Sequence, residues 1–384
     1  MLLSIVVYSL LALTLFALGW HVSCREARLK VASGGTLPFW SWEIILSIVV
    51  FAAVAGARYH TGYDHAAYLQ QYIDYQKYGF FTRDYEPLFM WVTQLMAGTH
   101  VHYFFFFALW AALQLAMLYY ALNRHKHIIP WVALILVLGP TFVHLMNTMR
   151  QGIVECAVPL LIVLAHDRKA VAFVLIVAAL SLLHFTSIFL LFIYLIKPAK
   201  FCTVPHKTLL VIAVICIFIG HTAMWVNAVS GVMSFFAEHH LTYGNELSVN
   251  PHHFSVNIGP VRVMMLLTQL LVIFFSKYLL EAKSDVEFKS AILIWAMLYI
   301  LGTSIMCNTT NFFQRPFELF TICYVIMMAM VVHELLAVKK HWAAIIILVS
   351  NATILGLILI KAWLRPDAQN LPQLYHFIPF GYVS

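Results

Sequence analysis

Apolar runs alternate with short polar connections along nearly the whole chain. A helix needs about 20 apolar residues to cross the roughly 30 Å hydrocarbon core of a bilayer, so each long run is a candidate span. The pattern predicts about twelve spans, which lie near residues 3–22, 38–57, 101–121, 128–146, 152–166, 170–183, 185–196, 208–226, 260–276, 290–306, 316–337 and 342–361. We therefore expect an all-α polytopic membrane protein with one membrane-embedded domain, residues 1–384.

Composition and charge agree with this class of protein. Of the 384 residues, 62% are hydrophobic and 10% are charged, and the mean hydropathy of +0.86 is far above that of soluble proteins. With these spans, 15 of the 23 Lys and Arg residues fall on one side of the membrane. The positive-inside rule makes that side the cytoplasm and places both termini outside. The net charge of +7 then reflects cytoplasmic loops rather than nucleic-acid binding.

Two large loops, residues 58–100 and 228–259, lie on the outer side in this topology. In the first loop, residues 86–98 are apolar but too few to cross the membrane, so we expect a re-entrant or interfacial helix. The second loop contains four histidines and several turn-forming residues, and it is a candidate mobile lid. Adjacent histidines on a helix cannot both face one ion, and the cysteines lack metal-ligand spacing, so we expect neither a metal nor a cofactor.

Arginine dominates among the eight basic residues outside the cytoplasmic set, since six of the eight are arginine. A planar guanidinium binds phosphate or carboxylate through two parallel hydrogen bonds, whereas an ammonium group cannot. Arg150, Arg262 and Arg315 lie at the outer ends of predicted spans, where a partly desolvated charge is costly and indicates function. We expect the three to converge. The structural alternatives are snorkelling to the interface, or pairing with Glu155 or Glu318.

The segment between Lys169 and Lys197 is too short for a full helical hairpin. Its two arms, residues 170–183 and 185–196, reach only about 20 Å each at 1.5 Å per residue, so the break at His184 lies below the outer surface. Irregular backbone at that depth has to face protein or a watery cavity. His184 is therefore a candidate acid–base residue at the floor of a cavity, with a structural hydrogen bond as the alternative role.

The first outer loop is rich in tyrosine and carries two candidate acid–base carboxylates. Asp64, Tyr68, Tyr72 and Tyr75 have the spacing that places them in one stripe on a helix. A tyrosine ring suits either a sugar ring or the belt at lipid headgroups. Asp64 and Glu86 are candidates to accept a proton from a sugar hydroxyl, and a helix N-cap is the alternative role for Asp64.

Five short motifs occur in an order that resembles the EpsG-like branch of Wzy-type polymerases of bacterial O-antigen, capsule and exopolysaccharide. They are "GYDHAAYLQQY", "YEPLFMWVTQLM", "MNTMRQGIVE", "LLHFTSIFLL" and "NFFQRPFELF", and together they extend over about residues 55–330. The pair Arg150–Gln151 and the later His184 match residues usual in that family. The chain departs from the family at residues 62–65, which read "GYDH" where a glycine, aspartate and threonine run is common.

The resemblance implies a GT-C-like membrane glycosyltransferase in the bacterial inner membrane, with its active site facing the periplasm. An acceptor hydroxyl would attack the anomeric carbon of the growing chain while undecaprenyl diphosphate leaves, without a metal. Other implied partners are membrane lipids, a Wzz-type chain-length regulator and a Wzx-type flippase. The predicted site residues have three roles: Arg150, Arg262 and Arg315 bind the diphosphate; Asp64, Glu86 or His184 positions or deprotonates the acceptor; and Tyr68, Tyr72 and Gln151 contact the sugar.

Three other functions compete with a polymerase. An O-antigen ligase would transfer polymer to lipid A core, but ligases usually carry their large outer loop late in the chain. A transporter or flippase usually has internal repeats and midplane charges. The chain shows no repeat, although Glu155 is a charge within a span. A membrane O-acyltransferase would employ His184 as a base but leave the outer arginines unexplained.

Overall fold

The computed structural model describes residues 1–62, 64–81, 84–196, 204–238, 259–281, 286–309, 311–364 and 374–378. Inter-residue contacts divide the chain into two compact units, and the boundary on the C-terminal side falls within helix α17 (Thr321–Ala337). Unit 1 contains Met1–Lys197 and Met328–Ser384, and unit 2 contains Pro198–Met327. The single membrane-embedded domain stays a prediction.

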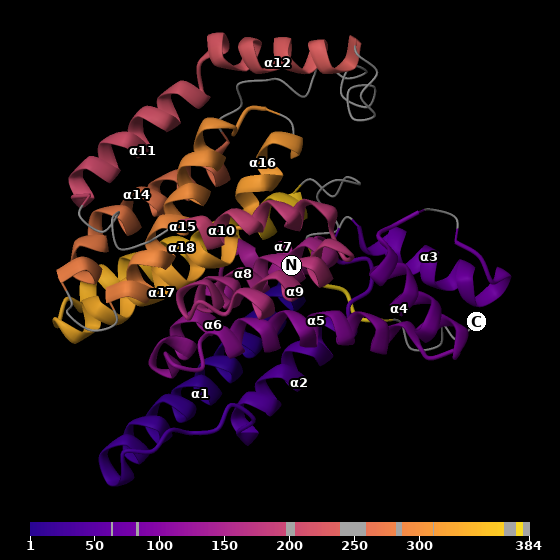
Figure 1. Cartoon of the computed structure of the whole chain (residues 1–384), viewed down its shortest axis with the longest axis horizontal. Helices are drawn as coiled ribbons and strands as arrows, with labels where there is room; N and C mark the ends of the chain where they lie inside the picture. Colours follow the sequence, from indigo (N-terminus) through magenta and orange to yellow (C-terminus); the bar gives the residue numbers. More distant parts are fainter. Residues whose placement is uncertain are drawn as a thin grey trace. The chain divides into compact units, whose positions relative to one another are not determined.

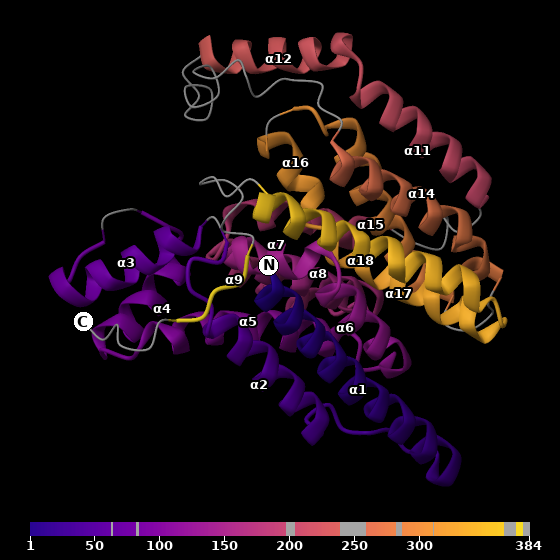
Figure 2. The ribbon, with the colours of Figure 1, turned by 180° about the vertical axis from the view of Figure 1, so that it is seen from behind.

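The regular structure of the described residues is helical, as the sequence predicts. The helices of unit 1 before α17 are α1 (Leu2–Ser33), α2 (Trp42–Gly56), α3 (His65–Tyr78), α4 (Pro87–Gly98), α5 (Tyr103–Ala121), η1 (Lys126–Ile128), α6 (Ile129–Val137), α7 (Pro140–Asn147), α8 (Met149–His166), α9 (Ala170–Ser181), η2 (Phe185–Leu191) and α10 (Phe192–Leu195). Helix α18 (His341–Leu364) returns to pack on α6 and α7. Helices α1, α2 and α5 lie side by side, and α3 packs with α4 (Figures 1 and 2).

Several helices are long and apolar enough to cross a membrane, so this is a multi-pass membrane protein. In the described part of the chain there are seven such helices, or up to nine if each of two bent pairs forms one span. The long helices of the described residues therefore number fewer than the roughly twelve expected spans. Three of the predicted segments form shorter apolar helices, Trp42–Gly56, Ala170–Ser181 and Phe185–Leu195. Helix α4, where we predict a re-entrant or interfacial segment, has only 12 residues.

The predicted span 128–146 is not a straight helix. The segment of η1 and α6, residues Lys126–Val137, meets α7 at an angle of 75°. Gly139 is extended, with φ −115° and ψ −176°, and Pro140 begins α7. Proline favours the first helical position because its ring fixes φ at a helical value. Its missing N–H costs nothing there, since an N–H in the first turn has no partner within the helix. The chain therefore turns sharply inside a predicted span.

Polar side chains from distant helices satisfy the main-chain groups that these breaks release. Asn351 of α18 donates from Nδ2 to Ile135 O at 2.9 Å. Its amide lies so close to Gly139 that a Cβ there would come within 2.6 Å of it. At the α7–α8 break, Gln114 of α5 donates from Nε2 to Leu145 O at 3.3 Å and to Met149 O at 3.2 Å. Since lipid offers no donors, such pairing is what permits irregular backbone within an apolar bundle.

The short hairpin of unit 1 has the predicted break at His184. Helix α9 ends at Ser181, His184 adopts an extended conformation with φ −156° and ψ 110°, and the 3₁₀ helix η2 follows. The two arms pack on each other. Ser187 is buried and its hydroxyl donates to the Ser181 hydroxyl at 3.2 Å. Leu183 and Ser187 are buried, whereas the Leu182 and Phe185 side chains are exposed, so protein covers the break only in part.

Unit 2 consists of helices packed mainly around α15. Its helices before α17 are α11 (His206–Gly220), α12 (Ala223–Glu238), α14 (Pro260–Glu281), α15 (Val286–Ile305) and α16 (Asn311–Glu318). Helix α12 turns away from α11 by 70° (Figure 1). The predicted loop 228–259 therefore begins as helix up to Glu238, and the rest of that loop, with its four histidines and the candidate lid, lies outside the described residues.

We expect Gln114→Met to destabilise the protein without changing its helix content. The substitution leaves the buried carbonyl groups of Leu145 and Met149 without their donor, which costs about 1–3 kcal/mol. The free energy of unfolding, measured in detergent micelles with a titrated denaturant, checks this. Gln94→Met, at an exposed position of α4, is the matched control. Equal stability of the two variants would contradict the role of Gln114.

Candidate active site

Arg150 lies in the first turn of α8, and its side chain is 18% exposed. Nη1 forms an ion pair with Glu86 Oε2, and Nε donates to the Tyr68 hydroxyl at 3.3 Å. The guanidinium carbon also lies 4.4 Å from the ring centroid of Tyr85 and 5.4 Å from that of Phe89. Aromatic faces attract cations, so these rings hold the guanidinium plane in place. Sequence reasoning missed Tyr85 and Phe89, although both belong to the motif "YEPLF".

Glu86 connects three segments that are far apart in the sequence. It precedes Pro87 and is extended, which turns its side chain away from the start of α4. While Oε2 pairs with Arg150, Oε1 lies 3.2 Å from His184 Nδ1 and accepts a bond from the Phe185 N–H at 3.4 Å. The structure thus brings together three residues that the sequence nominated from separate motifs: Arg150, Glu86 and His184.

Tyr68 of α3 is the fourth member of this cluster. Arg150, Glu86, His184 and Tyr68 together are called the Arg150 cluster. It is 4% exposed, and its ring packs 5.4 Å from that of Phe89. Burial raises the pKa of the Tyr68 hydroxyl, an effect that the neighbouring Arg150 charge partly offsets. The phenol is therefore neutral at physiological pH and accepts the bond from Arg150 while keeping its own proton.

Tyr72 and Tyr75 follow Tyr68 along α3, as the stripe predicts, but they serve packing. Tyr72 is fully buried, and its hydroxyl donates to Val101 O at 2.7 Å. Tyr75 packs against Phe81 at 4.6 Å between ring centroids. Protein groups thus occupy both the hydroxyl and the ring of Tyr72, and its contact with a sugar stays a prediction.

Asp64 stands at the N-cap position of α3, which was its alternative role, yet its side chain makes no capping bond. Its main-chain N–H donates to Asn147 Oδ1 at 3.0 Å, which ties the start of α3 to the end of α7. The residue is exposed, and its charge acts on the Tyr68 hydroxyl. Asp64 is therefore a carboxylate beside the Arg150 cluster that remains accessible to solvent.

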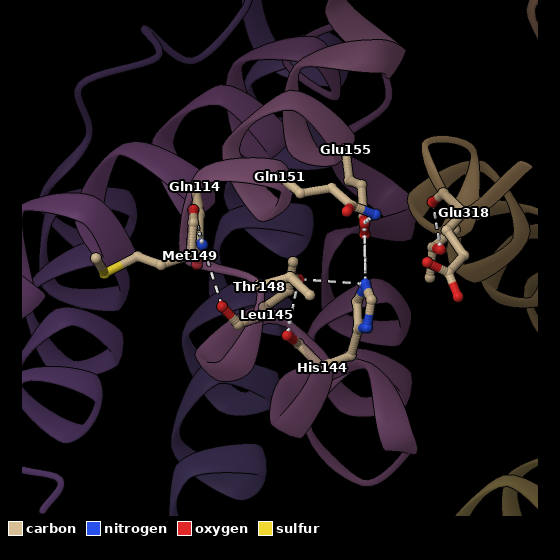
Figure 3. Close-up of polar contacts among 9 residues, drawn as sticks. Gln114, His144, Leu145, Thr148, Met149, Gln151, Glu155 and Glu318 are labelled. Atoms are coloured by element: carbon tan, nitrogen blue, oxygen red, sulfur yellow. Dashed lines mark hydrogen bonds and ion pairs between the residues drawn. The ribbon is translucent and has the colours of Figure 1, made fainter. Parts of the chain in front are cut away.

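Gln151 and Glu155 of α8 point toward each other, and Glu155 points toward His144 of α7 (Figure 3). Glu155 is fully buried and accepts a bond from Gln151 Nε2 at 2.9 Å, and its Oε1 lies 2.9 Å from His144 Nε2. Glu155 is thus not the partner of Arg150 that the sequence offered as an alternative. The Gln151 amide is buried and bonded to Glu155, and its sugar contact stays a prediction.

Arg262 and Arg315 belong to unit 2, whereas Arg150 belongs to unit 1. Arg262 donates from Nη2 to Thr303 O at 2.9 Å. Arg315 is exposed on α16, whose Phe317 ring packs where Gly302 has no side chain. The convergence of the three arginines stays a prediction.

A double-mutant cycle should detect strong coupling between Arg150 and Glu86. Both side chains are mostly buried, so removing one leaves the other charge poorly compensated, and we expect Glu86→Gln and Arg150→Met to couple by about 1–3 kcal/mol. The measurement is the free energy of unfolding in micelles. The pair Arg124–Asp167, at 2.9 Å, is the control: its arginine side chain is 62% exposed, and we expect less than about 1 kcal/mol. Coupling no larger than the control would contradict the pairing.

Comparison with known proteins identifies the family. The model of the EpsG family matches residues 42–376, which include α3, α4, α8 and every residue of the Arg150 cluster. No curated protein and no solved structure gives a significant match. The matched region also includes Leu374–His376, which lie beside the start of α3. The chain therefore belongs to the EpsG family, which makes it a membrane protein of the polysaccharide-polymerase type.

Proposed function

We propose that this protein is a glycosyltransferase of the bacterial inner membrane that joins undecaprenyl-diphosphate-linked oligosaccharide units on the periplasmic face. The observation that carries the proposal is the arrangement of Arg150. Its Nε and Nη1 are bonded to Tyr68 and Glu86, whereas Nη2 has no hydrogen-bond partner among the described residues. A guanidinium held on one edge by protein offers its remaining N–H groups to a ligand.

The difficult step of the reaction is the departure of the diphosphate. The acceptor oxygen forms a bond to the anomeric carbon, the bond from that carbon to the diphosphate oxygen breaks, and negative charge grows on the leaving group. Arg150 stabilises this charge best because its neighbours hold it in place before the reaction begins. Glu86 and His184 then serve to hold Arg150, and Arg262 and Arg315 are proposed to add further positive charge at the diphosphate.

Asp64 is the residue we propose to accept the proton of the acceptor hydroxyl. Glu86 is a poor base because it is paired with Arg150 and accepts the Phe185 N–H. His184 has its Nδ1 toward Glu86 and its Nε2 buried. Asp64 combines exposure with a position close enough to act on Tyr68. The proton then passes to solvent, and the diphosphate leaves as the undecaprenyl-linked anion.

Replacing Arg150 should slow polymerisation severely. We expect Arg150→Ala to lower kcat by about 100- to 1,000-fold, as loss of a preorganised charge-stabilising donor does. Arg150→Lys should recover little, because lysine lacks the planar fork. The measurement is the ladder of products that purified protein forms from lipid-linked repeat units alone. Lys77→Ala, which removes an exposed charge at the end of α3, is the matched control.

Each outcome of this assay points to one function. A ladder from the wild-type protein that is absent with Arg150→Ala supports a polymerase. Transfer only after lipid A core is added indicates a ligase, and movement of lipid-linked units across the bilayer without new bonds indicates a transporter. Long polymer from Arg150→Ala would overturn the role given to that residue.

The pH dependence of the reaction tests Asp64 separately. A carboxylate base loses activity as the pH falls, because protonation removes its ability to accept a proton. We expect kcat/KM of the wild-type protein to show such an acidic limb, and Asp64→Asn to be slower by about 100-fold or more, with that limb missing. The same acidic limb in both proteins would assign the base to another group.

A further inference from the structure

Arg58 is a buried cation held by main-chain oxygens instead of a carboxylate. Its side chain is 1% exposed, and its guanidinium carbon lies 4.8 Å from the centroid of the Phe107 ring. Nη1 donates to Ala55 O at 2.6 Å and Nη2 to Met146 O at 3.0 Å. Burial lowers the pKa of Arg58 to about 10, so it remains charged at neutral pH. No carboxylate of the described residues pairs with it, and such an arrangement is energetically costly.

The two oxygens that Arg58 binds belong to elements that the active site depends on. Ala55 is in the last turn of α2, just before the loop that leads into α3 and Tyr68. Met146 is near the end of α7, four residues before Arg150. The Arg58 guanidinium therefore links the end of α2, just before the loop into α3, to the end of α7, just before α8.

The same loop touches the end of α7 at two more points. The Asp64 N–H donates to Asn147 Oδ1 at 3.0 Å. Gly62 has φ +97°, and a Cβ there would come within 3.1 Å of Asn147 Cα, so only glycine suits both its conformation and its position. Three contacts thus dock the loop on residues 146–147.

The C-terminal segment, residues 374–378, holds the loop from another side (yellow trace in Figure 2). The Tyr59 N–H donates to His376 O at 2.8 Å, and the Ile378 N–H donates to Ala57 O at 3.0 Å. Tyr375 is buried, and its hydroxyl donates to Val54 O at 2.6 Å. Arg58 therefore lies in a loop that is fixed both by α7 and by the end of the chain.

We propose that Arg58 is a positioning residue that sets the start of α3 against the start of α8, so that Tyr68 and Arg150 meet. Replacing Arg58 with methionine leaves the buried carbonyl groups of Ala55 and Met146 without their donor, so the variant should also be less stable. A readout local to the loop is therefore needed to separate positioning from stability. Loss of Arg58 should loosen the docking of the loop while the helical bundle persists. The effect on turnover rests on the proposed function, whereas the effect on the loop does not.

The test compares full-length wild-type protein with Arg58→Met in nanodiscs. Hydrogen exchange should be accelerated more in residues 57–64 and 144–150 than in the other helices, while the unfolding temperature falls because two buried carbonyl groups lose their donor. In the polymerisation assay, kcat should fall by about 10- to 100-fold, the range expected for misplaced reacting groups, with KM within about twofold. Arg28→Met, at an exposed position of α1, is the matched control and should change neither readout.

The outcomes separate the two proposals. Unchanged exchange in both segments overturns the positioning role, even if the wild-type protein forms a ladder. If the wild-type protein forms no ladder, the proposed function fails, and the exchange data still decide the role of Arg58. Should Arg58→Met not fold, Asn147→Ala removes the acceptor of the Asp64 N–H. It should then speed exchange at residues 64–68, and unchanged exchange there overturns the docking of this loop.

Discussion

Main-chain carbonyl groups released where a helix breaks inside an apolar bundle must find protein donors, because hydrocarbon supplies none. In this protein, Asn351, Gln114 and Arg58 supply those donors on either side of α7. The three side chains come from α18, from α5 and from the loop after α2, and they are all buried. A short helix of eight residues is thereby held at a defined angle, and the helix that follows it starts at a defined point.

The position of Arg150 follows from that constraint. A cation in the first turn of a helix opposes the helix dipole, so it needs a negative partner from elsewhere. Glu86 provides this charge because the proline after it starts α4 and leaves Glu86 extended. The same carboxylate approaches His184 at the break of another hairpin. Three irregular points of the chain thus meet at one ion pair, and each is irregular for a local reason that the sequence shows.

Much of the arrangement around Arg150 was predictable from the sequence because its causes are local. Arg150 and Glu86 drew attention as charges beside apolar runs, and His184 as a break in arms too short to cross a membrane. The structure brings all three together. The bend before α7 had a local signal as well, in Gly139 followed by Pro140, but the length of the apolar run masked it and the sequence was interpreted as one straight span. The sequence could not show that Tyr72 donates to Val101 O or that Gln151 donates to Glu155, because spacing along the chain does not reveal a distant partner.

The sequence by itself determined that this chain is an all-helical membrane protein, because apolar length and period depend on nothing outside each segment. It also determined the family, whose motifs are short and ordered along the chain. Only the tertiary structure decided which acid neutralises Arg150, which donors cap the broken helices, and that the C-terminal segment packs beside the start of α3. These depend on contacts between residues separated by 31 to 321 positions. Such contacts form only after the helices pack, since no local pattern specifies which distant partner a polar side chain meets.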